Sequence, residues 1–483
     1  MKRLLIISAL FITIAVYSQG NINKPFDAFM KNEAMKNAAI SICVTDTKTD
    51  SILLSSTQQL CLVPASVQKL ITSASALEIL GGKQQFKTIV WSRGTIKNGK
   101  LTGDLVITGG GDPTLGSENF CVPGEKKKFL SEWAHQIKQR GIDTITGNLV
   151  ADPYLFSDQD VPGSWLWEDV ANYFGAVATG ISVYDDIYEL HFNVPAIEGQ
   201  PTEITHIEPE IPGLLLKNKV LSSSQKGDHA YVFGSPYDTY RLIKGTLPVG
   251  SPDFIVKASV PDASLLLANE LKKVLTDSLV VVLGDIEKKK VISPSRIDSQ
   301  QINVLWLSPD LSEIIEKMNK ESINLYAETL LKHIGFTISE NGSTEAGVAA
   351  IKDFWNKHGV DTQDLFMVDG SGLSRQNAFT AKTLVDILVY MKNKSPWFDA
   401  FKKSIPLTGI EGTQKNYFQE SVLKGKANAK TGSMTRVRSM AGYMTTQHGK
   451  EIAFAMIINN YSTTSSTVNQ IIEKWIESLY LNL

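Results

Sequence analysis

The chain has 483 residues, enough for two to four domains with a large core. Its 48 lysines and arginines nearly balance its 50 aspartates and glutamates, so the formal charge is −2, which argues against nucleic acid as the main partner. The three cysteines, Cys43, Cys61 and Cys121, do not have the spacing of a zinc site. Their odd number and separation favour buried thiols, and a disulfide between two of them is the alternative.

Residues 1–18 have the pattern of a secretory signal peptide. Lys2 and Arg3 form a basic start, residues 4–16 are an apolar run, and residues 16–18 (VYS) form a small-residue cleavage site. The run is short for a transmembrane helix, and no comparable stretch follows. We therefore expect an exported, periplasmic protein. Association with the membrane surface or the cell wall stays open.

The mature chain begins with a predicted hairpin and a buried helix. Residues 38–45 and 51–55 are short β-rich runs separated by polar residues. In residues 63–70 (VPASVQKL), Pro64 suits the first turn of a helix. Apolar side chains then recur at helical spacing, at Val67, Leu70, Ile71, Ala74 and Leu77.

Ser66 and Lys69 are three residues apart and therefore project from the same face of this helix. The free N–H groups at a helix start favour a developing negative charge near Ser66. Lys69 can take the serine proton only if its pKa is lowered towards neutrality. By itself, Ser-x-x-Lys is more typical of a solvated helix pair.

The rest of the chain divides into a β-rich section and a mainly helical one. Short predicted strands, broken by Gly, Pro and Asn, run to about residue 292: 88–91, 101–108, 147–151, 188–194 and 280–283. Helical periodicity follows in 311–319, 324–334, 344–358 and 381–392. The chain ends with a strand pair, 440–445 and 451–459, turned at His448-Gly449, and a helix, 467–480.

This order predicts one domain built from both chain ends. The N-terminal strands can complete a sheet with the C-terminal ones, so residues 19–85 and 295–483 form this domain. Residues 86–294 are then a β-rich insertion of one or two lateral domains.

Other catalytic patterns fail. Residues 94–100 (GTIKNGK) almost match a phosphate-binding loop, but Leu101 stands where Ser or Thr would reach magnesium. Asn98-Gly99 is instead typical of a hairpin turn. The seven histidines follow no pattern that would support a Ser-His-Asp triad.

Two further short motifs support Ser66. Residues 321–324 (ESIN) stand at the start of an apolar helix, where Ser322 could simply be an N-cap. Residues 429–433 (AKTGS) precede the terminal strands, where Lys430 could be an edge-strand lysine. Together with Ser66 and Lys69, they resemble the serine, Ser-x-Asn and Lys-Thr-Gly elements of penicillin-recognising enzymes.

The resemblance extends to one family. The long gap between Ser66 and Ser322 is similar to the insertion of class C low-molecular-mass penicillin-binding proteins, the D-Ala-D-Ala carboxypeptidase/endopeptidase family. Three segments are also similar to signatures of that family: residues 105–115 (LVITGGGDPTL), 165–176 and 369–377 (DGSGLSRQN). The resemblance implies an α/β (α+β) serine penicillin-recognising fold, with an antiparallel sheet flanked by helices and a large β-rich insertion.

The same resemblance implies a serine acyl-transfer reaction on peptidoglycan peptide stems, with β-lactams as covalent inhibitors and no metal or cofactor. Ser66 would attack the penultimate D-Ala carbonyl, with Lys69 as general base. Ser322 would relay a proton to the leaving amine, and Asn324 would hold Lys69 and the substrate amide. The substrate would also be bound by the third motif.

Within that motif, Lys430 would keep Lys69 neutral, and Thr431 would bind the substrate carboxylate beside Gly432. The N–H groups of Ser66 and Ser433 would form the oxyanion hole. The balance between carboxypeptidase and endopeptidase activity, the oligomeric state and the role of the insertion stay open.

Asp169 and Arg375 are implied at the rim of the site. Asp169 could pair with the ammonium of a diaminopimelyl side chain, and Arg375 could bind its carboxylate through two N–H bonds. Trp165, Trp167 and Tyr173 could line its aliphatic stem. The alternative is that Asp169 caps a local helix and Arg375 forms a surface ion pair.

Two other functions remain as alternatives. A β-lactamase needs an efficient deacylation device, and the large insertion is foreign to that class. The presence of every reactive side chain argues against a catalytically silent, wall-binding penicillin-binding protein. Labelling with a fluorescent penicillin separates the silent protein from an enzyme.

Overall fold

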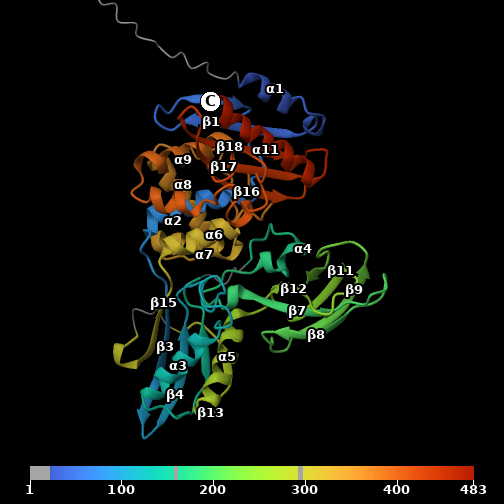
Figure 1. The fold of residues 1–483 in the computed structure, drawn as a ribbon. Helices are drawn as coiled ribbons and strands as arrows, with labels where there is room; N and C mark the ends of the chain where they lie inside the picture. Colours follow the sequence, from blue (N-terminus) through green and yellow to red (C-terminus); the bar gives the residue numbers. More distant parts are fainter. Residues whose placement is uncertain (1–21, 157–160, 292–296) are drawn as a thin grey trace, which may run out of the picture.

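The computed structural model describes residues 22–156, 161–291 and 297–483; the predicted signal peptide lies outside them. The upper part of the molecule in Figure 1 is built on an antiparallel sheet of order β16-β17-β18-β1-β2. Its strands come from both chain ends: β1 (Ala39–Asp46), β2 (Ile52–Ser56), β16 (Ala427–Met434), β17 (Val437–Thr445) and β18 (Glu451–Asn459). The expected sheet between the two ends is therefore present. We call this part the body.

The central strand of the body is buried on both faces. On β18, Ala455 and Ile457 face one apolar core, while Phe454 and Met456 face another. Strand residues alternate between faces, so a continuous apolar run is what a doubly covered strand requires. Helices α1 (Asn23–Met30) and α11 (Ser465–Asn482) cover the second face.

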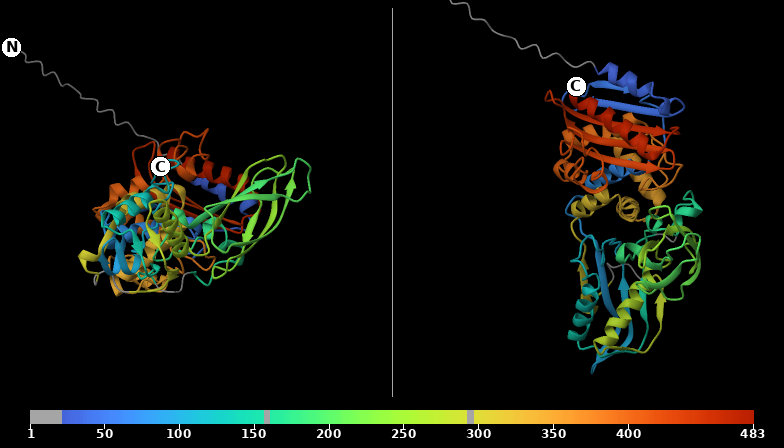
Figure 2. Two further views of the ribbon diagram at one scale, coloured as in Figure 1. Left: turned by 90° about the horizontal axis from the view of Figure 1, so that it is seen from below. Right: turned by 45° about the vertical axis from the view of Figure 1, so that its right-hand side comes forward.

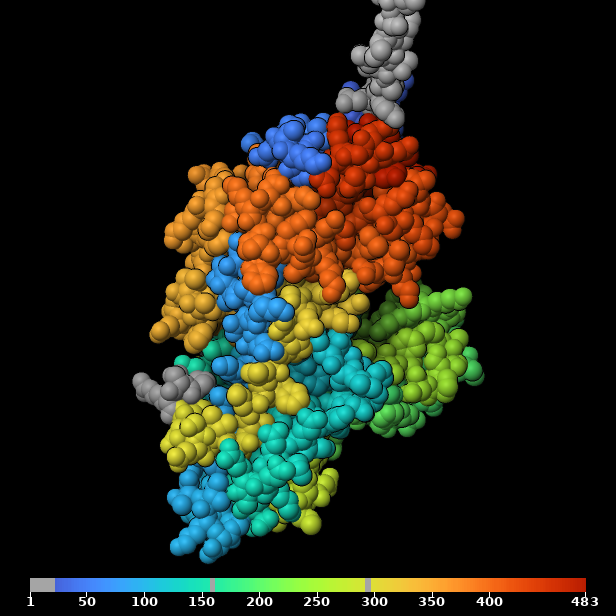
Figure 3. Space-filling model, turned by 60° about the vertical axis from the view of Figure 1, so that its left-hand side comes forward, coloured from blue at the N-terminus to red at the C-terminus, as the bar shows by residue number. Residues whose placement is uncertain are grey.

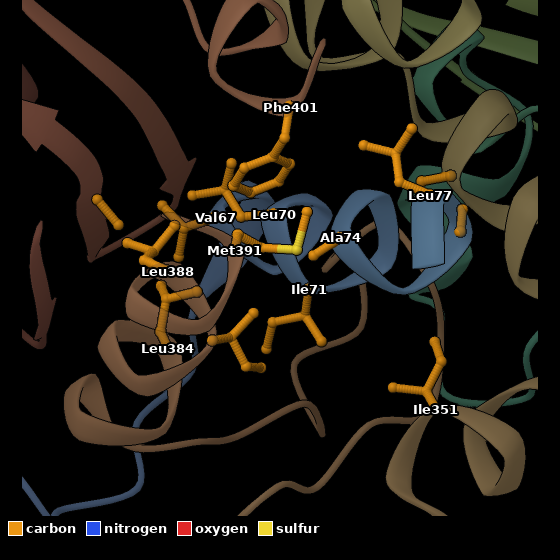
Figure 4. Packing of buried hydrophobic residues seen from close by; sticks show 14 of the residues in the cluster. Val67, Leu70, Ile71, Ala74, Leu77, Ile351, Leu384, Leu388, Met391 and Phe401 are labelled. Carbon is orange, nitrogen blue, oxygen red and sulfur yellow. The ribbon is translucent and has the colours of Figure 1, made fainter. Parts of the chain in front are cut away.

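Helix α2 (Gln68–Leu80) is the centre of the first core. Leu70 and Ile71, together with Val67 just before the helix, contact residues of the surrounding helices (Figure 4). Ala74 and Leu77 continue the same packing. The remaining helices of the body are α6 (Leu311–Glu321), α7 (Asn324–Ser339), α8 (Thr344–Lys357), α9 (Ala381–Lys394) and α10 (Phe398–Ser404). The ten residues from Gln68 to Leu77 are all buried, and five of them are polar, so this stretch of α2 has no solvent-facing side.

The insertion comprises residues 87–307. It forms a separate lobe beside and below the body (Figures 1, 2 and 3). Its largest sheet contains β3 (Lys87–Lys97), β4 (Lys100–Thr108), β5 (Thr144–Ile145), β6 (Leu149–Asp152), β13 (Val281–Val282), β14 (Ile286–Lys288) and β15 (Ile302–Leu307). Helices α3 (Lys128–Gln139) and α5 (Ala263–Asp277) pack against it.

Two three-stranded sheets complete the insertion. One has the order β12-β7-β8 and the other β10-β11-β9. Their strands are β7 (Ile187–Asn193), β8 (Glu203–Glu208), β9 (Leu215–Ser223), β10 (Tyr231–Phe233), β11 (Tyr240–Pro248) and β12 (Phe254–Ser259), preceded by the short helix α4 (Trp167–Val170). The insertion has its own apolar core.

Several local expectations can be compared with these elements. Asn98 and Gly99 have φ values of 50° and 78° and join β3 to β4 as a two-residue hairpin turn, as predicted. The three cysteines are free thiols. Because β15 pairs with β3, the insertion's sheet extends beyond residue 294, where the sequence analysis places its end.

In the described ranges, no helix is long and apolar enough to cross a bilayer. Among the same residues, no group of three or more His, Cys, Asp or Glu side chains could hold a metal ion.

Candidate active site

Ser66 lies in a tight turn before α2 that is held from two sides. The turn is a 3₁₀ segment (Ala65–Val67), and Ala65 has a φ of 50°. The Asn459 side chain on β18 exchanges two hydrogen bonds of 3.0 Å with the backbone of Val63. On β16, a Cβ added to Gly432 would lie 2.6 Å from the Pro64 carbonyl oxygen and 3.0 Å from Ser66 N. The serine is therefore fixed between two strands of the sheet.

Lys69 lies one turn further on, and its side chain is completely buried. Its Nζ lies 3.0 Å from Ser66 Oγ and donates to Asn324 Oδ1 at 2.6 Å and to the Ser371 carbonyl at 2.8 Å. Burial lowers the pKa of Lys69 to about 7, although the carboxylates of Asp369 and Glu328 act to raise it. Near pH 7, a large fraction of Lys69 is therefore uncharged.

The second motif lies at the junction of α6 and α7. Ser322 has a left-handed backbone (φ 60°) and ends α6, whereas α7 begins at Asn324. The alternative that Ser322 is the N-cap of α7 is therefore wrong, because Ile323 occupies that position. Asn324 Nδ2 donates to the Phe174 carbonyl at 2.8 Å, which directs its Oδ1 towards Lys69.

The third motif lies on edge strand β16. Lys430 is completely buried, and its Nζ donates to Ser322 Oγ and to the Thr431 carbonyl, both at 2.9 Å. Burial and the charge of Lys69 hold the pKa of Lys430 well below its usual value. Thr431 is half-buried, and Ser433 is exposed. The motif therefore links a buried amine to an accessible strand edge.

The outer edge of β16 is only partly covered. Residues 406–408 hydrogen-bond to it as far as Ala429. Beyond that point, β16 has no further strand partner among the residues that the structure describes. Such an edge presents backbone N–H and C=O groups to an extended peptide.

The segment 369–377 forms a loop beneath Lys69. The fully buried Asp369 carboxylate accepts five N–H groups at 2.6–3.0 Å, from Gln68, Trp165, Gly372, Ser374 and Asn377. Gly372 has a φ of 83°, and a Cβ there would lie 2.1 Å from the Ala65 carbonyl oxygen. This loop therefore packs directly against the Ser66 turn and needs glycine at that position.

Asp169 and Arg375 lie close enough to interact, but they form no ion pair within 4 Å in the described part of the chain. Asp169 is half-buried in α4, and Arg375 is exposed in the 369–377 loop. Burial raises the pKa of Asp169 to about 6; Glu168 adds to the rise and Arg375 opposes it. No capping hydrogen bond from a side chain supports the N-terminus of α4.

The predicted aromatic residues near Asp169 are placed differently from one another. Trp167 and Tyr173 are 62% and 52% exposed. Trp165 is buried, and its indole N–H donates to Asp369. The suggestion that Trp165 lines a substrate stem is therefore wrong, because its ring supports the loop instead.

Three groups around Lys69 were not predicted from the sequence: Glu328, the carboxylate of Asp369 and the Ser371 carbonyl. A signal for Glu328 was available, since it lies four residues after Asn324 and therefore shares its helix face. A backbone carbonyl such as that of Ser371 leaves no such signal in a sequence.

Comparison with known proteins agrees with this geometry. The model of the D-Ala-D-Ala carboxypeptidase 3 (S13) family matches residues 22–479. A D-alanyl-D-alanine carboxypeptidase of Actinomadura sp. (strain R39) is 29% identical, over 91% of this chain and 81% of that protein.

Two solved structures share the fold. Penicillin-binding protein 4 (dacB) of Haemophilus influenzae is 24% identical, with a TM-score of 0.80 over 95% of this chain and 99% of that one, and it has also been solved with a β-lactam. A predatory peptidoglycan endopeptidase of Bdellovibrio bacteriovorus is 18% identical, with a TM-score of 0.50 over 92% and 93% of the two chains. The chain thus has the expected penicillin-recognising fold, and it belongs to the D-Ala-D-Ala carboxypeptidase 3 (S13) family of serine hydrolases.

Proposed function

We propose that Ser66 is the nucleophile of this carboxypeptidase and Lys69 its general base. The observation that carries the proposal is the position of the buried Lys69 amine, 3.0 Å from Ser66 Oγ, with a pKa lowered to about 7. A neutral amine has two N–H groups and one lone pair. Asn324 Oδ1 and the Ser371 carbonyl accept the two N–H groups, which leaves the lone pair for the serine proton.

Acylation then proceeds without a metal or cofactor. Ser66 Oγ attacks the carbonyl carbon of the penultimate D-Ala, and its proton passes to Lys69 Nζ. The tetrahedral oxyanion is bound by the N–H groups of Ser66 and Ser433. Ser322, which accepts from Lys430, passes a proton to the departing amine as the C–N bond breaks.

Deacylation reverses the same steps with water. Water attacks the ester carbonyl, its proton passes to the base, and Ser66 is released as the alcohol. Thr431 and Lys430 bind the substrate's terminal carboxylate, and Gly432 lets β16 approach the serine. The uncovered edge of β16 supports binding of an extended peptide stem.

The same geometry favours acylation by β-lactams. These are acyl donors whose leaving amine stays attached to the acyl group after the ring opens. Cross-linked stems are a second substrate class, because an amine donated by a neighbouring stem can leave as readily as D-Ala. The fold shared with a Bdellovibrio endopeptidase is in keeping with this activity. A wall substrate and the signal-like residues 1–18 favour a periplasmic location.

For the peptide side chain, we propose that Asp169 and Arg375 bind the ammonium and the carboxylate of a diaminopimelyl end. Supporting this proposal, Asp169 is half-buried, no side-chain hydrogen bond caps the N-terminus of α4, and Arg375 lies within electrostatic reach. The exposed rings of Trp167 and Tyr173 offer apolar surface for the aliphatic stem.

Mass spectrometry after incubation with benzylpenicillin tests the central proposal. We expect one adduct, on the peptide that contains Ser66, and none in Ser66→Ala. The matched control is Ser73→Ala, because Ser73 lies on α2, directly after the Ser66 turn, and donates to Leu70 O. An adduct on another residue, or an undiminished adduct in Ser66→Ala, would refute the assignment.

A further inference from the structure

Beneath Lys69, one buried carboxylate has no place in the reaction described above. Glu328 lies on α7, four residues after Asn324, and is 2% exposed. Residues four apart on a helix share a face, so both side chains point towards α2. Glu328 hydrogen-bonds to Gly370 and Ser371, through their backbone N–H groups and the Ser371 side chain.

Those contacts fix a short stretch of the 369–377 loop. Glu328 Oε1 accepts the Ser371 N–H at 2.7 Å, and both of its oxygens lie 2.9–3.0 Å from the Gly370 nitrogen. On the other side of the same stretch, Thr72 donates to the Gly370 carbonyl. The next peptide unit carries the Ser371 carbonyl, which accepts from Lys69, and its own N–H, from Gly372, donates to Asp369 Oδ1 at 2.8 Å. Glu328 therefore holds this stretch on the N-terminal side of the carbonyl and Asp369 on the C-terminal side.

We infer that Glu328 is a positioning residue, which holds the Ser371 carbonyl so that the lone pair of Lys69 points at Ser66 Oγ. This inference rests on the proposed function. A freely moving Ser371 carbonyl would release one N–H of Lys69, and the amine could then rotate its lone pair away from the serine. Glu328 therefore acts on the reaction through Lys69 without touching substrate.

Charge gives the same residue a second, measurable effect. The ionisable groups that interact with Lys69 are Glu328 on α7, Asp369 in the loop and Lys430 on β16. Burial and the neighbouring Asp369 raise the pKa of Glu328 to about 7. Ionised Glu328 favours the charged form of Lys69, so its removal should let Lys69 lose its proton at lower pH.

Glu328→Gln tests the inference, with the second-order rate of benzylpenicillin acylation measured from pH 5 to pH 9. The amide keeps the size of the side chain, but the NH₂ group that replaces Oε2 lies against the Gly370 N–H, and two donors cannot hydrogen-bond to each other. We expect a plateau rate lower by about 10- to 100-fold. We also expect the acid limb of the profile to move to lower pH, by roughly half a unit or more.

Two outcomes would overturn the inference: a plateau rate like that of the wild type, or a lower plateau with an unmoved acid limb, which a merely structural role would give. The matched control is Glu473→Gln on α11, because Glu473 also accepts a backbone N–H, from Phe418 at 2.9 Å, far from Lys69 in the fold. This control should keep the wild-type profile.

A second variant keeps the test decisive if Glu328→Gln does not fold. Glu328→Asp retains the charge but is one methylene too short to hold both N–H groups. It should lower the plateau and leave the acid limb in place, and a wild-type plateau would contradict the inference. Labelling of the wild type and its loss in Ser66→Ala are read in parallel, so failure of the proposed function is recognised separately.

Discussion

The body and the insertion both bury ionisable groups, but they hold them in different ways. In the insertion, Asp112 accepts from Thr114, and Asp186 accepts from the Val183 N–H, partners two and three residues away in the chain. The buried Arg241 donates to carbonyls within six residues. Each group therefore stabilises its own turn.

In the body, the buried charges reach across the chain. Lys69 contacts partners 255 and 302 residues away, and Lys430 contacts Ser322, 108 residues away. Asp369 accepts from Gln68 across 301 residues. These groups converge on one serine from separate elements. In these examples, each buried charge of the insertion stabilises its own turn, whereas the buried charges of the body converge on Ser66.

The sharpest test of that distinction is Lys69→Met, which keeps a buried, unbranched side chain and removes the amine. Without the base, acylation of Ser66 by benzylpenicillin should slow by about 10³-fold or more, within the range usual for general-base catalysis. The rate is measured by stopped flow on protein whose fold is checked by circular dichroism. A loss smaller than tenfold would remove Lys69 from the role of base.

The pH profile of the wild-type protein sharpens the same point. Only the neutral amine of Lys69 accepts a proton, and its pKa is lowered to about 7. The acylation rate should therefore level off above pH 7 and fall towards tenfold per pH unit below it. A profile that is flat between pH 5 and pH 8 would mean that Lys69 does not control the step.

Asp169 would be an exception to this difference between the lobes, because it belongs to the insertion but is proposed to bind substrate. For a peptide with a free diaminopimelyl end, Asp169→Ala should lower kcat/KM. The fall should correspond to a loss of about 1–3 kcal/mol of transition-state stabilisation. A peptide with the same backbone and a simple alkyl side chain should be almost unaffected. The matched control is Glu168→Ala, since Glu168 is the exposed neighbouring carboxylate. Equal losses on both peptides would make Asp169 structural.

Asp186→Asn tests the insertion's own pattern. Burial raises the pKa of Asp186 to about 8, so the folded protein keeps a proton that the unfolded chain releases near pH 4. Relative to the variant, the wild type should lose unfolding free energy as pH rises from 4 to 8, by at most about 1.4 kcal/mol per pH unit. Urea unfolding at pH 4.5 and 7.5 measures this difference.

Acylation by benzylpenicillin should stay within twofold of the wild type in Asp186→Asn, since the group serves its own turn. A large loss of acylation in a variant that is still folded would show that the insertion's buried charges also act on the site.

Sequence patterns predicted what depends on local spacing. The shared face of Ser66 and Lys69 follows from helical periodicity, and the Asn98-Gly99 turn follows from two residues that tolerate positive φ. The position of Ser322 was not predictable in this way, because its role in capping depends on where α6 ends. The contacts of Glu328 and Ser371 depend on tertiary packing across 43 residues, which no local pattern contains.

The two hydrogen bonds between the Asn459 side chain and the Val63 backbone affect when the active site can form as the chain is synthesised. The two residues are 396 positions apart, and Val63 directly precedes the serine turn. Contacts of such sequence separation close late in folding, because the intervening chain must first be brought together. A nascent chain that already carries Ser66 and Lys69 still lacks β16 and β18. A chain that ends before β16 and β18 lacks Lys430 and the contacts of Asn459, so we expect it to be inactive until its last strand is in place.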